Sequence, residues 1–432
     1  MAFKLEAFQN RFLAPGQTRV DGVVTVTSSA DVNASAELVV GFILDKSGSM
    51  AGERITSVIG AVRRAIELLD ERTWFFVVTF DGLPNVQVPP LRATAENKRL
   101  AAESLATVTA GGGTAMSVGL GAARGLFDKA PNAIHQAIFL TDGKNEGEKR
   151  ERVIAELAAA RGHFECDCWG VGTDWQVGEV QEIAGALLGK ASLIPEPRGV
   201  DAAFRTAIQK ASGKALKDVR LRIWTPAGSE LVFLKQVNPT IEELTGKGRV
   251  VSKQVQEFMT GSWGAGESRD FHVAVEVKAG KVTEEMLAAR PSIAYLAADP
   301  ASPTGWVELE EKSPEGRLFA AWTADDSLSS RLDQHVAHYT GQDELAAAIE
   351  KGLTERERGN EAAATQLLGR AVTLAHTSGN ADMTQRLKKV VEILDPAMGT
   401  VRLKKDASKA AAMDLQLESR TTKRVARKEG NA

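Results

Sequence analysis

Five oxygen-bearing side chains stand where apolar stretches of the chain give way to polar loops. They are Asp45, Ser47, Ser49, Thr114 and Asp142. All five offer oxygen, and none offers sulfur or imidazole, which suits a hard cation rather than zinc. Mg²⁺ takes about six oxygens at roughly 2.1 Å and usually keeps some waters. The residue types therefore predict a Mg²⁺ site with room for one outside ligand, and Mn²⁺ is an alternative because oxygen-only sites accept both ions.

For these side chains to meet, the loops that carry them must lie at one edge of a single sheet. Residues 36–213 alternate apolar runs with helical patterns. Runs that are apolar on both faces and alternate with helices are typical of the α/β class, with a doubly wound, mostly parallel sheet. In such a sheet the loops after the strands share one crevice. Glycines 111–113 would let the backbone approach a bound ion closely.

The same patterns predict the elements of this domain. The expected strands are 37–45, 73–81, 135–143, 164–174 and 190–195. The expected helices are 53–71, 96–108, 117–130, 148–162, 177–189 and 200–211.

Four other segments surround this domain. Residues 1–35 hold one strand-like run, 19–30, which must pair with a later strand because a single strand cannot stand alone. Residues 214–325 alternate like an antiparallel β-sandwich and are the natural partner, so the α/β domain is inserted in the sandwich or precedes it. Its core is expected to contain Trp224, Trp263, Trp306 and Trp322.

The remaining chain is expected to be helical and then flexible. Residues 326–395 contain helical patterns at 343–358, 360–379 and 381–394, which predict a small helical region. From Arg402 onward the chain carries nine Lys or Arg and four Asp or Glu. Residues 396–432 therefore read as a basic, solvated, flexible tail.

The five oxygen donors carry a family resemblance. Asp45, Ser47 and Ser49 form the pattern D-x-S-x-S, Thr114 lies in a glycine-rich loop, and Asp142 lies in a T-D-G strand end. This set resembles an intact metal-ion-dependent adhesion site (MIDAS) of von Willebrand factor A (VWA) domains over residues 36–213. The resemblance implies a module that binds a partner protein when the partner's Asp or Glu completes the metal shell. It also implies five parallel strands and one antiparallel edge strand, at 73–81.

The chain as a whole resembles intracellular bacterial proteins in which a VWA domain is joined to a sandwich and a helical C-terminus. That resemblance leads us to expect a signalling adaptor. The alternative in this class is a substrate-adaptor subunit of an AAA+ ATPase or of a kinase signalling system.

Enzyme alternatives use the same crevice. The strand end at Asp45 resembles that of phosphatases of the haloacid dehalogenase type. Those enzymes need a second Asp as general acid at the position where Ser47 stands. A hydrolase would use Ser117 with Asp142 and His163, but a loop, not a strand, precedes Ser117. We therefore expect no catalysis. The plainest alternative is a polar turn in which Ser49 caps the next helix.

Composition limits the partners and the compartment. The chain has 432 residues and a net charge of -3, so no overall charge recruits nucleic acid or an anionic membrane. Two cysteines, Cys166 and Cys168, cannot form a disulfide framework and are expected to be core thiols. No signal peptide or spanning helix is expected, so we expect a cytoplasmic protein.

Two threonines in the predicted tail are candidate phosphorylation sites. Thr421 and Thr422 lie among basic residues, and a phosphothreonine there would suit a Ser/Thr kinase and a forkhead-associated reader. The simpler interpretation is an unmodified solvated tail. His335 and His338 are expected to be a helix-surface pair.

Overall fold

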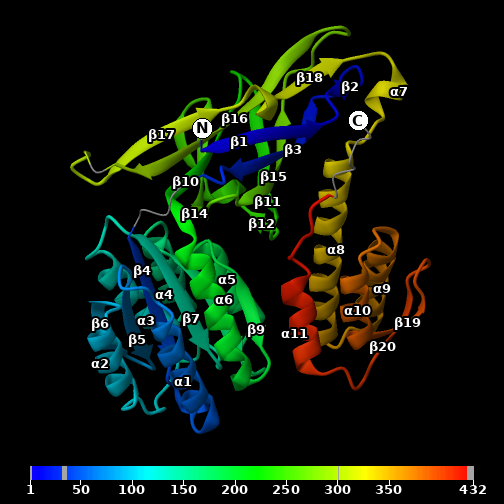
Figure 1. Ribbon diagram of the computed structural model, residues 1–432. Helices are drawn as coiled ribbons and strands as arrows, with labels where there is room; N and C mark the ends of the chain where they lie inside the picture. Colours follow the sequence, from blue (N-terminus) through cyan, green and yellow to red (C-terminus); the bar gives the residue numbers. More distant parts are fainter. Residues whose placement is uncertain (1, 32–36, 300, 426–432) are drawn as a thin grey trace.

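The computed structural model describes residues 2–31, 37–299 and 301–425. Figure 1 shows an α/β domain and a helical region, both lying below a part of the chain built from two sheets. In the residues described, no helix is long and apolar enough to cross a membrane.

The α/β domain is built on a six-stranded sheet. The strand order is β6-β5-β4-β7-β8-β9, and only β6 runs antiparallel to its neighbour. The strands are β4 (Leu38–Asp45), β5 (Trp74–Phe80), β6 (Pro84–Arg92), β7 (Ile134–Thr141), β8 (Glu165–Val171) and β9 (Ala191–Ile194). β4 is buried along its whole length between β5 and β7, which explains why its sequence is apolar on both faces.

The expectation that residues 73–81 form the antiparallel edge strand is wrong. β5 lies inside the sheet and is parallel to β4, and the antiparallel edge is β6. Six of the seven residues of β5 are buried, so this strand needs a neighbour on both sides. β6 carries Pro89 and Pro90 and is mostly accessible to solvent, as suits an edge strand. Its weak apolar pattern is why the sequence did not predict it.

Helices cover both faces of this sheet. One face packs against α1 (Glu53–Glu67), α2 (Ala95–Leu105) and α6 (Val200–Ser212). The other face packs against α3 (Met116–Phe127), α4 (Arg150–Ala160) and α5 (Val177–Ala186). The domain is therefore doubly wound, with the carboxyl ends of β4 and β7 at the same edge.

The second part consists of two mainly antiparallel sheets that share one hydrophobic core. The first has the order β1-β3-β15-β11-β12, and the second has the order β13-β14-β10-β16-β18-β2 with β17 beside β16. The first sheet contains β1 (Phe3–Gln9), β3 (Arg19–Ser28), β11 (Glu230–Asn238), β12 (Glu242–Glu243) and β15 (Ser268–Glu276). The second contains β2 (Phe12–Leu13), β10 (Lys214–Trp224), β13 (Arg249–Ser252), β14 (Val255–Gly264), β16 (Glu285–Ala298), β17 (Trp306–Lys312) and β18 (Leu318–Trp322).

The N-terminal residues contribute three strands, not the one that the sequence predicts. β3 pairs with β15, which is about 250 positions away along the chain, and β1 pairs with β3. The sequence does not reveal β1 because Lys, Leu, Glu and Ala within it favour helices. Its alternation is nevertheless that of a strand, with Phe3 and Leu5 buried in the shared core.

The tryptophans only partly follow expectation. Trp263 and Trp322 lie in the core between the sheets. The indole of Trp306 instead donates to the carbonyl of Asn132 in the α/β domain (2.9 Å). Trp224 is half-buried, with the guanidinium of Arg290 5.0 Å from its ring centre. Successive side chains of a strand point to opposite faces, so the register of the strand decides whether a tryptophan points inward or outward. The positions of the tryptophans in the sequence do not fix that register.

The predicted flexible tail is wrong for residues 396–425. After α7 (Asp326–Ser329), α8 (Gln334–Glu357), α9 (Glu361–Thr377) and α10 (Ala381–Val390), the chain forms β19 (Val391–Asp395) paired with β20 (Thr400–Leu403), and then α11 (Lys409–Glu418). Residues 391–394 are thus strand and not the helix expected. Leu415 lies in the helical core, while Met413 and Leu417 pack against the α/β domain. Several basic side chains of this segment form ion pairs, for example Arg420 with Glu350, so local charge did not reveal the buried face.

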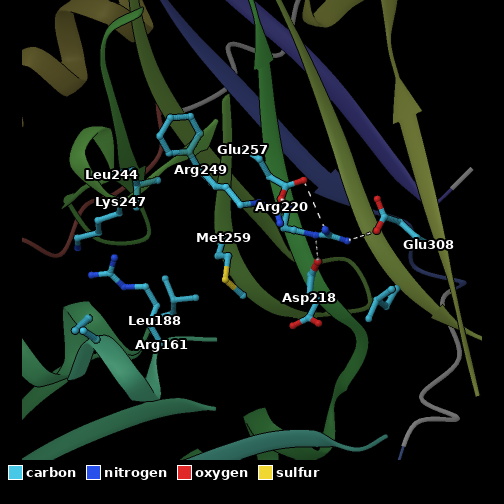
Figure 2. Close-up of a pocket in the computed structure, with 14 residues that line it drawn as sticks. Arg161, Leu188, Asp218, Arg220, Leu244, Lys247, Arg249, Glu257, Met259 and Glu308 are labelled. Carbon is cyan, nitrogen blue, oxygen red and sulfur yellow. Dashed lines mark hydrogen bonds and ion pairs between the residues drawn. The ribbon is translucent and has the colours of Figure 1, made fainter. Parts of the chain in front are cut away.

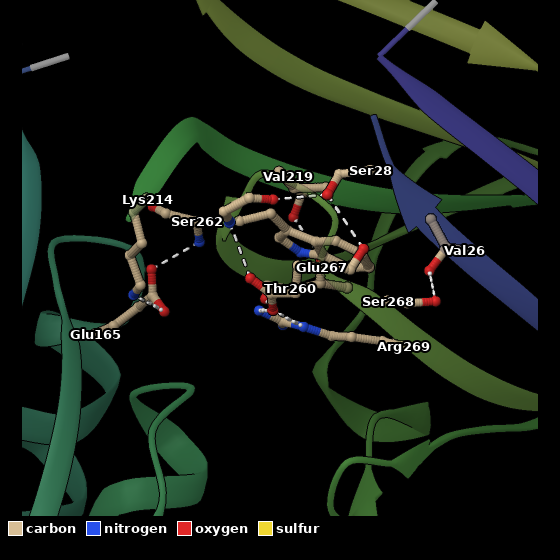
Figure 3. Close-up of polar contacts among 12 residues, drawn as sticks. Val26, Ser28, Glu165, Lys214, Val219, Thr260, Ser262, Glu267, Ser268 and Arg269 are labelled. Carbon is tan, nitrogen blue, oxygen red and sulfur yellow. Dashed lines mark hydrogen bonds and ion pairs between the residues drawn. The ribbon is translucent and has the colours of Figure 1, made fainter. Parts of the chain in front are cut away.

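A buried polar contact joins the α/β domain to the sheets (Figure 3). Lys214 of β10 donates to Glu165 of β8 and to Gln136 of β7, both at 2.7 Å. The second oxygen of Glu165 accepts from the backbone of Ser262 in β14 (2.6 Å). Because these buried charges are paired and hydrogen-bonded, their burial between the domain and the second sheet is tolerated.

Candidate metal site

Asp45 anchors the candidate site at the end of β4. Its side chain is fully buried. One carboxylate oxygen accepts from the backbone N–H of Ser47 (2.8 Å), and the other accepts from the hydroxyl of Thr141 (2.6 Å). Burial raises the pKa of Asp45, these hydrogen bonds oppose the rise, and the nearby charge of Asp142 adds to it. A cation beside the carboxylate would relieve this desolvation.

The loop after β4 brings the hydroxyl of Ser49 to Asp142 and that of Ser47 beside it. Residues Gly48–Met50 form a 3-10 turn. The hydroxyls of Ser47 and Ser49 lie 3.1 Å apart, and that of Ser49 donates to Asp142 (2.7 Å). Ser49 does not cap α1, whose N-cap is Gly52 and carries no side-chain cap. The interpretation of the motif as a simple helix cap is therefore wrong.

Backbone hydrogen bonds hold the glycine-rich loop against the loop after β4. The N–H of Gly111 donates to Lys46 (2.7 Å), and that of Gly48 donates to Gly112 (3.1 Å). Gly112 has a φ of +85°, and a Cβ there would lie 2.9 Å from the side chain of Asp81. Only glycine fits this turn. The turn leads directly to Thr114, whose side chain is buried.

A small space faces the hydroxyls of Ser49 and Thr114. A Cβ added to Gly143 would lie 3.4 Å from the Ser49 oxygen and 3.5 Å from the Thr114 oxygen. Gly143 directly follows Asp142, so its missing side chain leaves this space open. With the hydrogen bonds above, these distances bring the five side chains of Asp45, Ser47, Ser49, Thr114 and Asp142 together beside the ends of β4 and β7, and this group is called the crevice below.

The donor set fits a hard cation. It comprises two carboxylates and three hydroxyls, and only Ser49 is exposed. Over the described part of the chain, no cluster of three or more His, Cys, Asp or Glu side chains is placed to hold a metal. The candidate site has only two such side chains, Asp45 and Asp142, and its other donors are hydroxyls, so it is not a cluster of that kind. Hydroxyl and carboxylate oxygens are the ligands that Mg²⁺ accepts.

Sequence reasoning missed one member of the crevice, Arg54 in the first turn of α1. One guanidinium nitrogen donates to Asp142 (2.5 Å), and the other donates to Asp174 (3.2 Å). Contact with Asp142 raises the pKa of Arg54. A signal was present, because a cation is unfavourable at a helix N-terminus and its presence there calls for an anionic partner.

The residues of the enzyme alternatives do not come together. Ser117 donates to Glu148, and His163 pairs with Asp128 (2.6 Å). Cys166 and Cys168 are free, buried and 3.7 Å apart. Ser117, at the start of α3, and His163, beyond the end of α4, therefore have separate partners: Glu148 lies just before α4, and Asp128 lies at the C-terminal end of α3.

Four other polar residues that the sequence singled out have structural contacts. His335 stacks on Phe8 with ring centres 3.8 Å apart, and His338 hydrogen-bonds the carbonyl of Lys423 (2.8 Å). Thr422 is buried, and its hydroxyl donates to Val237 (2.5 Å). Thr421 forms a β-bridge with Thr240. The exposed tail that phosphorylation would require is therefore not found at these two threonines.

A larger cavity lies away from the candidate site, between the α/β domain and the second sheet (Figure 2). Its volume is about 530 Å³. Arg161 and Lys247 line one side, and an ion-paired group lines another: Arg220, Arg249, Glu257 and Glu308. None of the five oxygen donors contributes to its walls. This cavity is therefore separate from the place where the five oxygen donors would bind a cation.

Comparisons with known proteins agree with the fold. A model of the von Willebrand factor type A domain matches residues 38–193, and a model of the von Willebrand factor type A C-terminal domain matches residues 373–419. The chain is similar to a solved von Willebrand factor type A structure from Catenulispora acidiphila, with 37% identity, a TM-score of 0.89 and coverage of 98% of this chain and 97% of that one. It shares its fold with an ArnB paralog, VWA2, from Sulfolobus acidocaldarius, at 16% identity, a TM-score of 0.62 and coverage of 97% and 98%.

Curated relatives match over shorter stretches. An uncharacterized protein of Synechocystis is 26% identical over 258 residues, which is 57% of this chain and 60% of that protein. Inter alpha-trypsin inhibitor, heavy chain 4, of Mus musculus is 30% identical over 144 residues, 31% of this chain and 15% of its own length. The chain thus spans less than two thirds of these two relatives. Given the likeness over nearly the whole Catenulispora structure, the chain belongs to the von Willebrand factor type A family.

Proposed function

We propose that this chain is a metal-dependent protein-interaction module. VWA domains are protein-interaction modules in general. In the proposal, Asp45, Ser47, Ser49, Thr114 and Asp142 hold Mg²⁺ or Mn²⁺, and a partner protein supplies an Asp or Glu to complete the shell. The observation that carries the proposal is the space at Gly143, which the Ser49 and Thr114 hydroxyls face beside the carboxylate of Asp142.

The burial pattern supports a partner that approaches from one side. Four of the five donors are buried, while Ser49 is exposed. A cation there would be open to solvent at Ser49. Because the hydroxyls carry no charge, a cation among them would keep much of its attraction for an incoming carboxylate.

The proposal includes no catalysis by this chain. Ser47 stands where a phosphatase of the kind considered would place its general acid. Ser117 is bonded to Glu148 and not to an imidazole. The proposal also includes a reducing compartment such as the cytoplasm, supported by the free thiols of Cys166 and Cys168. The partner could belong to a signalling system or to an AAA+ machine.

Affinity capture from a lysate of the native host tests this function. The full chain is used as bait in Mg²⁺ and in EDTA, as wild type and as Asp45→Ala. Asp201→Ala is the matched control, because Asp201 on α6 is an exposed carboxylate that pairs with Arg64 on α1. We expect a partner that is captured by wild type and by the control only in Mg²⁺. Equal capture in every arm would place the interface elsewhere.

A further inference from the structure

The two buried carboxylates of the crevice have unequal access to positive charge. Two cations lie close by, Lys46 and Arg54. Lys46 pairs with Asp81, on the side of the glycine-rich loop. Arg54 pairs with Asp142, whose side chain is completely buried. Asp45 accepts hydrogen bonds from Ser47 and Thr141.

We infer that Arg54 is the counter-ion of Asp142 in the metal-free protein and that it must leave Asp142 before a cation can bind there. This inference rests on the proposed metal site. One oxygen of Asp142 accepts from Ser49 and the other accepts from Arg54 (2.7 and 2.5 Å). Both oxygens are therefore engaged by the chain itself. A guanidinium and a divalent cation repel each other, so they compete for this carboxylate.

The surroundings of Arg54 make such an exchange feasible. Its side chain is 33% exposed, whereas that of Asp142 is 0% exposed. Its second nitrogen already contacts Asp174, a largely exposed carboxylate after β8. The guanidinium can therefore leave Asp142 and remain both paired and hydrated. A fully buried arginine would have no such alternative.

The exchange sets the affinity of the site. With Arg54 present, a cation can bind Asp142 only after the charge-assisted hydrogen bond between Arg54 and Asp142 is broken. Without Arg54, Asp142 would be a buried carboxylate that has lost the cation with which it is paired, close to Asp45. Arg54 thus offsets part of the negative charge of the metal-free site and makes cation binding weaker and more reversible.

Calorimetric titration of the full chain with MgCl₂, after removal of metals with EDTA, tests the inference. Arg54→Gln is compared with wild type and with Arg64→Gln. Arg64 is the matched control because it lies on the same helix and carries the same charge, but it pairs with Asp201 on the surface. We expect Arg54→Gln to bind Mg²⁺ about tenfold more tightly, which corresponds to roughly 1.4 kcal/mol. Arg64→Gln should match wild type.

The possible outcomes separate this inference from the proposed function. Equal or weaker binding by Arg54→Gln, with binding by wild type, would overturn the inference and leave the metal site standing. Equal tightening by both variants would also overturn it, because the effect would be one of overall charge. Binding by Arg54→Gln alone would support the inference but argue against a metal-dependent wild type. Binding by neither would overturn both.

A second measurement follows Arg54 directly. A crystal structure of the wild type grown with MnCl₂ would show whether the guanidinium still contacts Asp142 when the metal is bound. We expect that contact to be lost and the contact with Asp174 to be kept. Mn²⁺ bound with Arg54 still on Asp142 would overturn the inference.

Discussion

Lys214 of β10 and Glu165 of β8 form a buried ion pair, 2.7 Å long, at the junction of the α/β domain and the second sheet. The side chains are 4% and 11% exposed. A charge placed there is tolerated only with its partner, because desolvation of an unpaired ion is expensive. The pair therefore adds a side-chain contact between two parts of the molecule that the chain itself joins twice, from β3 to β4 and from α6 to β10.

Removal of one partner of this pair should destabilise the protein strongly. We expect Lys214→Met to lower the free energy of unfolding by about 3–5 kcal/mol, because Glu165 is then buried without its cation. Urea denaturation followed by circular dichroism measures the change. Lys235→Met is the control, since the partly exposed pair of Lys235 with Asp343 should contribute less than about 1 kcal/mol. A similar loss in both variants would mean that burial of the pair is not the cause.

The pKa of Asp45 predicts a pH dependence in the metal-free protein. Burial raises this pKa, so the folded state binds the proton more readily than the unfolded state does. At neutral pH the buried carboxylate of Asp45 is charged, which lowers the stability of the folded state. This cost disappears as the pH falls through the raised pKa. We expect Asp45→Asn to be more stable than wild type at pH 7 in EDTA, with the difference shrinking toward pH 4.

Denaturation of both proteins at several pH values checks this sign. A difference that is constant with pH would show that the carboxylate stays charged throughout. In excess Mg²⁺ the order should reverse, because wild type gains stability from the ion and Asp45→Asn does not.

Filling the space at Gly143 should block the site without unfolding the domain. The added methyl group of Gly143→Ala would lie at ordinary contact distance from Ser49 and Thr114, so the fold is retained. We expect the affinity for Mg²⁺ to fall by about tenfold or more, equivalent to 1.4 kcal/mol or above. Gly82→Ala, with open space around its Cβ, is the control and should bind like wild type. Calorimetric titration distinguishes the two, and unchanged binding by Gly143→Ala would place the ion elsewhere.

The C-terminal helix should contribute to the stability of the α/β domain. Leu417 of α11 is 4% exposed and packs in the same core as α5 and β9. Leu417→Ala should cost about 2–5 kcal/mol, as for other buried leucines. Leu394→Ala, at a residue that is 52% exposed, should change stability by less than about 0.5 kcal/mol. Thermal unfolding of the two variants gives the comparison, and a small effect at Leu417 would mean that α11 is only loosely docked.

The local sequence determined much of the α/β domain. Apolar runs such as Leu38–Asp45 are buried on both faces, and that pattern, alternating with helices, is typical of a sheet covered by helices on both sides. The place of Asp45 and Asp142 at strand ends followed from the same pattern, because parallel strands end at one edge. These features depend on periodicity within a few residues, which a single sequence displays.

Tertiary structure alone decided the neighbours of these elements. Arg54 and Asp142 are 88 positions apart, and no local pattern reports which carboxylate a long, flexible guanidinium reaches. The order of the sheet placed β5 inside and β6 at the edge, although β5 has the more regular strand pattern. The C-terminal residues appeared solvated because their charges are frequent. Their buried face became visible only where Met413 and Leu417 meet the α/β domain, since burial is a property of the assembled surfaces and not of composition.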